Sequence, residues 1–427
     1  MLYCPLRMLS YGLLLILLAN CGAAAMAESE TPTTGAGEQI LYVAPQQAEN
    51  GRGVSQATAA DFRDTDFWSL VRQANQNGPV LVNFLDGKYI VSSNAENAMP
   101  TLSLADLGHK DHPLTLQGIS QNGVVFTRHP DDSMEGKNGP GFLQITRSQN
   151  LVVRNLHFTG KQPIGYATHF GGSVNVLIEG CSWIDLPGVY YGATGTANAS
   201  TDHVTFKDCV FKRVGSGGHA HMAYNAYDPK HIRFVNCRFE DCAGDYVRFR
   251  DGTDFGVVVG CTFKSTGYYR NVNMPFITVP LFNDDDPAEQ KRSPNYEFFG
   301  THFLIFDNTF IYANDRPEGV RVALLFHHSG FDPPGRKHLL TEEQAGLLED
   351  GTVAEKKAFM LENLGVDANS VHFFNNRFIG VDLKVAYRSG AAYGAKSKGW
   401  SGTVDIADTV NGAEVAETVE DALRFFD

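Results

Sequence analysis

The amino-acid sequence predicts an all-β fold: a single-domain right-handed parallel β-helix, a solenoid in which successive coils of the chain stack. One short phrase recurs between His203 and Phe263, as HVTFKDCVF, HIRFVNCRF and FGVVVGCTF. Each copy has an alternating apolar run, a polar or glycine residue, a cysteine, a variable residue and an aromatic. The closing aromatics Phe211, Phe239 and Phe263 are 28 and 24 residues apart, a spacing typical of solenoids and propellers.

The period within each copy is two residues. Val204 and Phe206 share one face, whereas polar residues intervene, which is the pattern of a β-strand. A propeller blade needs roughly 40 to 50 residues for its four strands, so the shorter repeat favours a β-helix. Four further copies end in an aromatic residue, at Phe158, Trp183, Phe310 and Phe378.

The residue two positions before each aromatic predicts an interior ladder. The members of this ladder are Cys181, Cys209, Cys237, Cys261, Asn308 and Asn376. Equivalent residues of stacked coils lie above one another, so we expect the cysteines to be small buried side chains and not a disulfide framework.

The N-terminus has the features of a secretory signal. Residues 1–27 contain Arg7, the apolar run YGLLLILLA and the sequence Ala25-Met26-Ala27, which has the form of a signal-peptidase site. We therefore expect export to the periplasm or the extracellular space. No later run of 18 apolar residues follows, so we expect no transmembrane segment. A lipid anchor at Cys21 is the less favoured alternative, because Asn20 is an awkward residue before a lipidated cysteine.

Caps are expected at both ends of the solenoid. Residues 28–39 are polar and predict a disordered leader, and residues 40–79 predict an N-terminal cap. Within this cap, Asp61–Asn77 places Phe67, Leu70, Val71 and Ala74 on one face of a helix that would shield the open first coil. At the other end, residues 401–427 predict a C-terminal cap or tail.

Residues 80–400 form the predicted β-helix. The long intervals after Phe263 and Phe310 predict two insertions, at about 268–301 and about 314–369. The second is expected to be partly helical, from about Thr341. Insertions of such length commonly carry function.

The formal net charge of −13 makes nucleic acid an unexpected partner. On this acidic chain, the turns after successive aromatics carry aromatic and basic residues. Aligned by glycine, one predicted column contains Tyr190, His219, Tyr246 and Tyr269, and the next contains Gly192, His221, Arg248 and Asn271, with Tyr224 and Arg250 further along. Coils are about 4.8 Å apart, so these side chains should form one patch on the surface.

Strand alternation places the residues of the third copy. Val247 and Phe249 are expected to face the core, which leaves Tyr246, Arg248 and Arg250 facing solvent. Cations could pair with carboxylate or sulfate, and tyrosine faces could contact sugar rings. The pattern therefore predicts an acidic polysaccharide as the partner.

The coils resemble the pectin-lyase-like superfamily of right-handed parallel β-helices, whose enzymes mostly cut acidic polysaccharides. The segment VRFRDGTDFGVVVGCTF is similar to part of the chondroitinase B and alginate lyase family. This resemblance implies that Arg250 is the catalytic arginine and that Lys230 corresponds to the basic lysine. The interval from Lys230 to the coil aromatic is two residues shorter than in that family, and Cys261 stands where the family has asparagine.

A polysaccharide lyase acting by β-elimination on a uronic-acid glycan is the predicted function. Arg250 would neutralise the uronate carboxyl, His221 or Lys230 would be the base, and Tyr246 or Tyr224 would protonate the leaving oxygen. The residues predicted to bind substrate are Tyr190, His219, Tyr224, Arg248, Tyr269 and Asn271.

Two other functions remain open. A glycoside hydrolase would use a pair among Asp245, Asp251 and Asp254, although Asp is also common in bends. A non-catalytic surface protein would need only the Tyr and Arg faces to bind a glycan.

No cofactor or metal is assigned from the sequence. The run Asp284-Asp285-Asp286 resembles a loop that attracts calcium but is more typical of a solvated turn. Of His327 and His328, at most one can point into a given site, because adjacent residues of a strand face opposite ways.

Overall fold

The computed structural model describes most of the chain between residues 37 and 407. The described residues are 37–46, 48, 51–92, 99–132, 141–162, 164–187, 192–216, 220–250, 253–269, 275–282, 303–313, 322–329, 371–381, 383–389, 392–394 and 404–407. One compact unit spans Gln39–Phe426, and the elements below belong to it. The expected signal peptide and all but the end of the expected leader lie outside the described residues.

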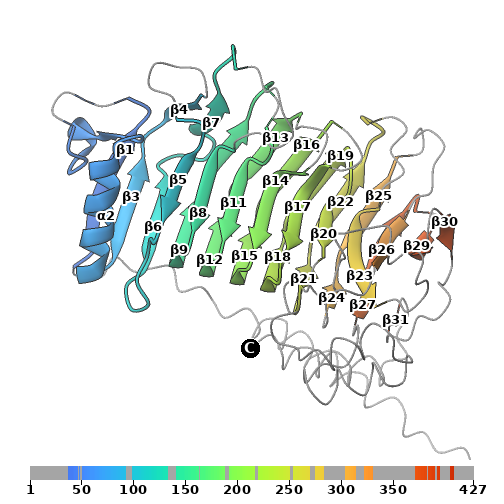
Figure 1. Cartoon of the computed structure of the whole chain (residues 1–427). Helices are drawn as coiled ribbons and strands as arrows, with labels where there is room; N and C mark the ends of the chain where they lie inside the picture. Colours follow the sequence, from blue (N-terminus) through green and yellow to red (C-terminus); the bar gives the residue numbers. More distant parts are fainter. Residues whose placement is uncertain are drawn as a thin grey trace, which may run out of the picture. The chain divides into compact units, whose positions relative to one another are not determined.

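Three long β-sheets make up this unit (Figure 1). The first contains, in spatial order, β2 (Ala60–Asp61), β1 (Gln39–Ala44), β3 (Val80–Phe84), β6 (Leu114–Gly118), β9 (Gln149–Arg154), β12 (Val174–Glu179), β15 (Asp202–Lys207), β18 (Lys230–Val235), β21 (Val257–Val259), β24 (Phe303–Phe306), β27 (Val371–Phe374) and β31 (Val404–Ala407). The second contains β4 (Gly87–Val91), β7 (Val124–Arg128), β10 (Leu156–Thr159), β13 (Ser182–Leu186), β16 (Val210–Val214), β19 (Arg238–Cys242), β22 (Thr262–Ser265), β25 (Thr309–Tyr312) and β28 (Arg377–Ile379). The third contains β5 (Leu102–Ala105), β8 (Leu143–Thr146), β11 (Thr168–Gly171), β14 (Gly192–Ala199), β17 (Ala220–Ala226), β20 (Val247–Phe249), β23 (Ile277–Phe282), β26 (Val322–Ser329), β29 (Leu383–Ser389) and β30 (Ala392–Gly394).

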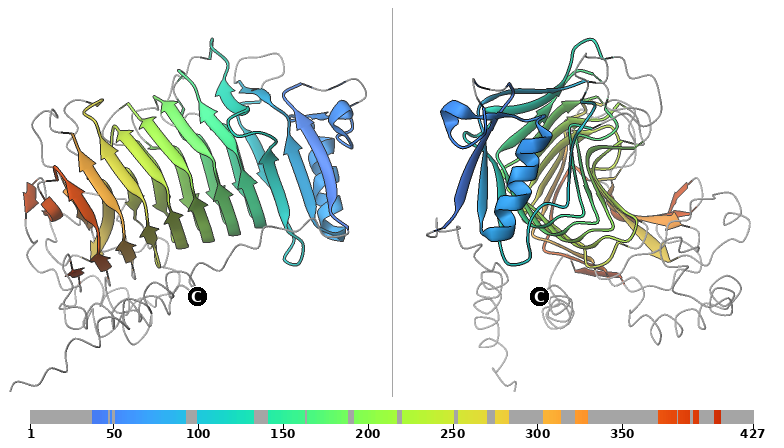
Figure 2. Two further views of the ribbon diagram at one scale, coloured as in Figure 1. Left: turned by 180° about the vertical axis from the view of Figure 1, so that it is seen from behind. Right: turned by 60° about the vertical axis from the view of Figure 1, so that its left-hand side comes forward.

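The order of the strands defines a parallel β-helix. Along most of the chain every third strand returns to the same sheet and pairs in parallel with the strand three before it, as β12, β15 and β18 do. Among the described strands, only the pair β29 and β30 is antiparallel. Figure 2 shows the coils following one another from the blue to the red end. The predicted fold class is confirmed.

An aromatic ladder fills the interior. The rings of Trp183, Phe211, Phe239 and Phe263 stack in sequence with centroid separations of 4.4, 4.9 and 4.8 Å. The ladder continues to Phe310 at 5.0 Å. Each ring belongs to a second-sheet strand in register with its neighbour, so the coil repeat itself produces the stacking.

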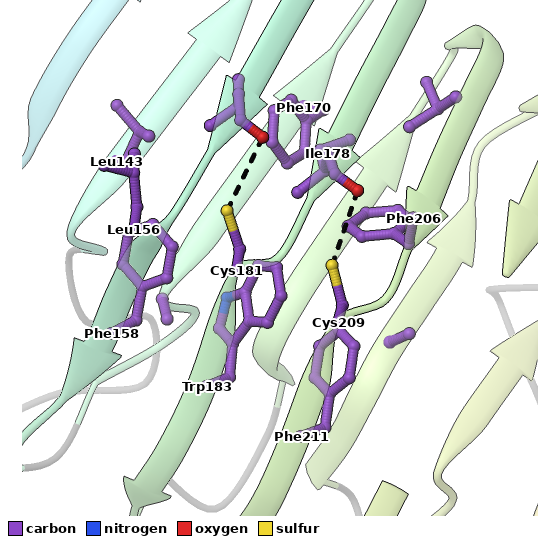
Figure 3. Close-up of a cluster of buried hydrophobic side chains, with 14 of the residues drawn as sticks. Leu143, Leu156, Phe158, Phe170, Ile178, Cys181, Trp183, Phe206, Cys209 and Phe211 are labelled. Atoms are coloured by element: carbon purple, nitrogen blue, oxygen red, sulfur yellow. Dashed lines mark hydrogen bonds between the residues drawn. The ribbon is translucent and has the colours of Figure 1, made fainter. Parts of the chain in front are cut away.

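The predicted cysteine ladder is also present. Cys181, Cys209, Cys237 and Cys261 are buried free thiols, and each thiol lies close to a main-chain carbonyl of the preceding coil. Figure 3 shows the Cys209 thiol directed at the Ile178 carbonyl oxygen, 3.5 Å away. Farther along, Asn308 takes the same position, and its side-chain amide donates to the Val258 carbonyl. Thiol and amide therefore fill one role in this ladder.

The helix α2 (Thr65–Asn77) lies at the first coil, after the short 3-10 turn η1 (Gln56–Thr58). It buries Phe67, Trp68 and Val71, and the Trp68 indole nitrogen donates to the Phe62 carbonyl at 2.8 Å. Asp64 caps its N-terminus by accepting from the backbone of the first turn. In the right-hand view of Figure 2, which brings the N-terminal end forward, α2 lies in front of the coils.

The expected insertions and tail contain regular strands, which corrects their predicted extent. β23 falls within the expected insertion 268–301, and β26 falls within the expected insertion 314–369; both pair in the third sheet. β31 falls within the expected tail 401–427 and pairs with β27 in the first sheet. The helix expected from Thr341 lies outside the described residues. No helix in the described part of the chain is long and apolar enough to span a bilayer.

Candidate functional site

Side chains on the outer face of the third sheet gather basic, aromatic and hydroxyl groups. Parallel pairing puts His169, Ala197, Tyr224, Arg248 and Thr278 at equivalent positions of β11, β14, β17, β20 and β23. The side chains at the flanking positions of these strands, such as Val247 and Phe249, are fully buried in the core. The predicted inward direction of Val247 and Phe249 is therefore correct, whereas Arg248, on the opposite face of β20, is itself buried and not exposed to solvent as predicted.

The predicted columns themselves are wrong in register. His221 lies beside Ala193, and Arg248 lies beside Tyr224, not beside His221. The pairing of β14 with β17 shifts at a bulge between Ala193 and Thr196, so an alignment anchored on glycine does not carry through it.

The buried carboxylate of Asp245 holds neighbouring side chains of this site. Asp245 is 1% exposed, and its Oδ2 accepts from Arg248 Nη1 at 3.1 Å and from Thr278 Oγ1 at 2.9 Å. His221 Nδ1 lies 3.8 Å from the same oxygen. Arg248 and His221 are themselves 9% and 6% exposed. Asp245 thus holds Arg248 in an ion pair. The sequence predicted that Arg248 would be open to a ligand, and this prediction is wrong.

His221, Tyr224 and Arg250 form a trio in which His221 and Arg250 each contact Tyr224. The rings of His221 and Tyr224 stack with centroids 5.1 Å apart and planes 21° from parallel. Arg250 Nη1 donates to the Tyr224 hydroxyl at 2.8 Å, and its guanidinium carbon lies 5.7 Å from the ring centroid. The backbone amide of Arg250 donates to the Asn225 carbonyl, which fixes the start of this side chain. A cation thus lies beside a phenol, where it can stabilise negative charge on that oxygen or on a bound carboxylate.

Tyr246 is wrongly placed by the sequence prediction. It is 3% exposed, its ring packs edge-on against Phe263 and Phe276, and its hydroxyl donates to the Lys264 carbonyl at 2.9 Å. Burial raises the pKa of Tyr246 well above its ordinary value. Because β20 begins only at Val247, the strand alternation does not extend to Tyr246. This residue belongs to the core.

Lys230 lies on another wall of the solenoid. It begins β18 of the first sheet. Its backbone is in register with Asp202 on one side and forms an isolated parallel β-bridge with Asp254 on the other. The single patch expected from the sequence therefore does not include it. Tyr269 follows the second-sheet strand β22 and is partly buried against Tyr268, and burial is the main cause that raises its pKa.

Tyr190, His219, Asn271, Asp251 and the run 284–286 lie outside the described residues. His327 and His328 belong to β26, whose backbone pairs with β23 and whose side chains there are not described.

Asp245 and Thr278 were not predicted as supports of the arginine. The spacing Asp-x-x-Arg at Asp245 and Arg248 could have suggested an ion pair, but nothing near Thr278 in the sequence points to its role. The same face continues to His169, whose ring lies 5.4 Å from that of Tyr166, and burial lowers the pKa of His169.

No protein-family model and no curated protein matches this chain. Solved structures with a similar chain path include an alginate lyase from Paenibacillus sp. str. FPU-7, at 12% identity and TM-score 0.42, over 75% of this chain and 96% of that one. The surface adhesin PfbA of Streptococcus pneumoniae matches at 13% identity and TM-score 0.38, over 76% and 91% of the two chains. A GH136 lacto-N-biosidase from Eubacterium ramulus matches at 10% identity and TM-score 0.39, over 82% and 67%. At these identities the likeness concerns the fold alone.

Proposed function

We propose that this protein is an exported polysaccharide lyase that cleaves a uronic-acid-containing glycan by β-elimination. The observation that supports this proposal is the contact between Arg250, Tyr224 and His221 on the outer face of the third sheet. The reaction needs a cation for the uronate carboxylate, a base for the proton on the adjacent carbon, and an acid for the leaving oxygen. These three side chains supply one group of each kind.

The roles follow from the chemistry of each group. Arg250 pairs with the uronate carboxylate and stabilises the charge that builds up as the adjacent C–H bond breaks. Neutral His221 accepts that proton, and a carbon–carbon double bond forms as the glycosidic C–O bond breaks. Tyr224 donates its proton to the departing oxygen, so the step consumes no water and no oxidant. Tyr246 and Lys230 are left out, since one is buried in the core and the other lies on the first sheet.

Arg248 has a supporting role. Its guanidinium is bound to Asp245, and Arg248 lies in register with Tyr224 on the adjoining strand. The carboxylate of Asp245 therefore balances the positive charge of Arg248. In this proposal Arg248 supports the strand face on which Tyr224 lies. Tyr269 is proposed as a contact for sugar rings, and so are Tyr190, His219 and Asn271, which lie outside the described residues.

The experiment incubates the purified protein with alginate, polygalacturonate, chondroitin sulfate and other uronic-acid polysaccharides, and follows the absorbance of new double bonds. We expect one substrate to be cleaved, and Arg250→Ala, Tyr224→Phe and His221→Ala each to lose at least about a hundredfold in kcat/KM, the lower range for a lost acid or base. Arg238→Ala, an exposed arginine on the second sheet, and Tyr227→Phe, 61% exposed, are the matched controls and should keep full activity.

Full activity in folded Arg250→Ala would refute the assignment. Reducing ends without double-bond absorbance would favour a hydrolase, and retention on immobilised glycan without products would favour a binding protein. The hydrolase has less support, because Asp245 is bound by Arg248 and Thr278, and Asp254 is 3% exposed and lies at the first sheet, where its backbone pairs with that of Lys230.

A further inference from the structure

One column of residues at or just before the start of the first-sheet strands has a left-handed backbone in five successive coils. The residues of this column are Asn150, Asn175, His203, His231 and Phe255, with φ of 52°, 55°, 53°, 51° and 58°. Asparagine tolerates this conformation well. In the first two coils the Asn175 amide donates to the Asn150 side-chain oxygen at 3.2 Å, which gives an ordinary asparagine ladder. The next two coils replace asparagine by histidine.

These two histidines converge on one carboxylate. Asp202 Oδ1 lies 2.8 Å from His203 Nδ1 and 2.7 Å from His231 Nδ1. The imidazole rings stack with centroids 4.1 Å apart. One potential ligand atom from each of the three residues lies within 4.8 Å of the other two.

We propose that Asp202, His203 and His231 form a binding site for one divalent transition-metal ion, with Zn²⁺ as the best fit. Two imidazole nitrogens and one carboxylate oxygen are a ligand set of zinc, whereas Ca²⁺ and Mg²⁺ prefer oxygen alone. Zinc bonds of about 2.0 to 2.2 Å separate tetrahedral ligand atoms by about 3.4 Å, so the cluster needs to open by roughly 0.6 Å, which side-chain rotation allows. Three protein ligands leave the fourth position for water or for an external ligand.

The surroundings suit such an ion. The ring of His231 is packed between His203 and Phe255, the latter at 4.7 Å and 5° from parallel, so its orientation is fixed. The His203 side chain is 47% exposed, which leaves an access route from solvent. This site lies at the start of the first-sheet strands β15 and β18 and does not depend on the proposed lyase activity.

The test titrates the full chain, freed of metal by a chelator, with Zn²⁺ by calorimetry and with Co²⁺ by visible absorbance. We expect one ion per chain. His203→Asn and His231→Asn should each weaken binding at least tenfold, and the double variant should abolish it. Asparagine is the residue of the same ladder at Asn150 and Asn175, so these variants should fold, and circular dichroism with an unchanged unfolding midpoint checks this.

The matched control is His109→Asn. His109 stacks on His112 with ring centroids 4.9 Å apart and lies beside an aspartate, but in the described part of the chain these residues do not group as metal ligands. The His109→Asn variant should bind Zn²⁺ with the same affinity as the unchanged chain. The proposal is overturned if the unchanged chain binds no Zn²⁺ in this titration. It is equally overturned if the double variant still binds, or if His109→Asn removes binding.

Discussion

The ion pair between Asp245 and Arg248 gives the sharpest test of the site's architecture. Asp245 has 1% and Arg248 has 11% of its side chain exposed, and one N–O contact of 3.1 Å joins them. Asp245→Asn keeps the shape of the side chain and removes its charge. Arg248→Met keeps most of the length of the side chain and removes the opposite charge. Each single change leaves one charge buried without its partner.

The magnitude follows from that burial. Removing one partner of a buried pair costs about 3 to 5 kcal/mol, and the slight exposure of Arg248 puts each variant near 3 kcal/mol. Replacing both partners leaves no unpaired charge, so the double variant should cost about 2 kcal/mol or less. The double variant should thus be about 4 kcal/mol more stable than the sum of the single changes implies.

Urea unfolding followed by circular dichroism measures the three free energies of unfolding. The surface pair Asp185 and Arg213, with side chains 51% and 26% exposed, is the matched control, and its coupling should stay below about 1 kcal/mol. Additive effects at Asp245 and Arg248, within about 0.5 kcal/mol, would show that the carboxylate does not balance the arginine and would refute this reasoning.

Four further outcomes are expected. Phe239→Ala removes a ring that is 1% exposed and whose centroid lies 4.9 and 4.8 Å from those of Phe211 and Phe263. It should lower the free energy of unfolding, measured in urea, by about 3 to 5 kcal/mol. The control Tyr227→Ala changes a residue that is 61% exposed and should alter that free energy by less than about 0.5 kcal/mol. Gly108→Ala places a Cβ 1.7 Å from a backbone carbonyl oxygen at φ +81°, so its thermal midpoint should fall clearly, and an unchanged midpoint would contradict the turn geometry. Burial lowers the pKa of His169 below 6.5, so on acidification His169 takes up its proton first in the unfolded chain. The free energy of unfolding should therefore fall as the pH drops from about 6.5 through the lower pKa of the folded state. The variant His169→Gln should reduce that fall, which urea midpoints at several pH values measure. Lys230→Ala should keep the polysaccharide-cleaving activity, because Lys230 begins a strand of the first sheet, and a hundredfold loss would return it to the site.

Much of the fold could be predicted because its repeat is written in the sequence. Val204 and Phe206 alternate with polar residues, and this period of two fixes which side chains enter the core. The interval between Phe211 and Phe239 fixes the length of a coil, and identical phrases one coil apart place like residues above like. The position of Cys209 within the phrase was therefore enough to predict its burial and its place in a ladder.

The site could be predicted only in part. Arg250, Tyr224 and His221 were all identified as candidates, but their mutual contacts depend on how β14, β17 and β20 pair. The pairing of β17 with β20 puts Tyr224 beside Arg248, three residues away from the predicted partner His221, and no periodicity in the sequence marks that register. The insertions were misjudged for a related reason, since the aromatic spacing follows the second sheet and gives no information on strands that the long segments add to the third.

The sequence by itself determined the solenoid, its coil length and its interior ladders, because burial of alternating side chains in stacked coils leaves a regular pattern along the chain. Only the tertiary structure decided that Tyr246 is buried, that Lys230 lies on another sheet, and that Asp245 binds Arg248. The physical reason is that turns have no period: the direction of a side chain there depends on contacts with residues of other coils, which local sequence does not encode.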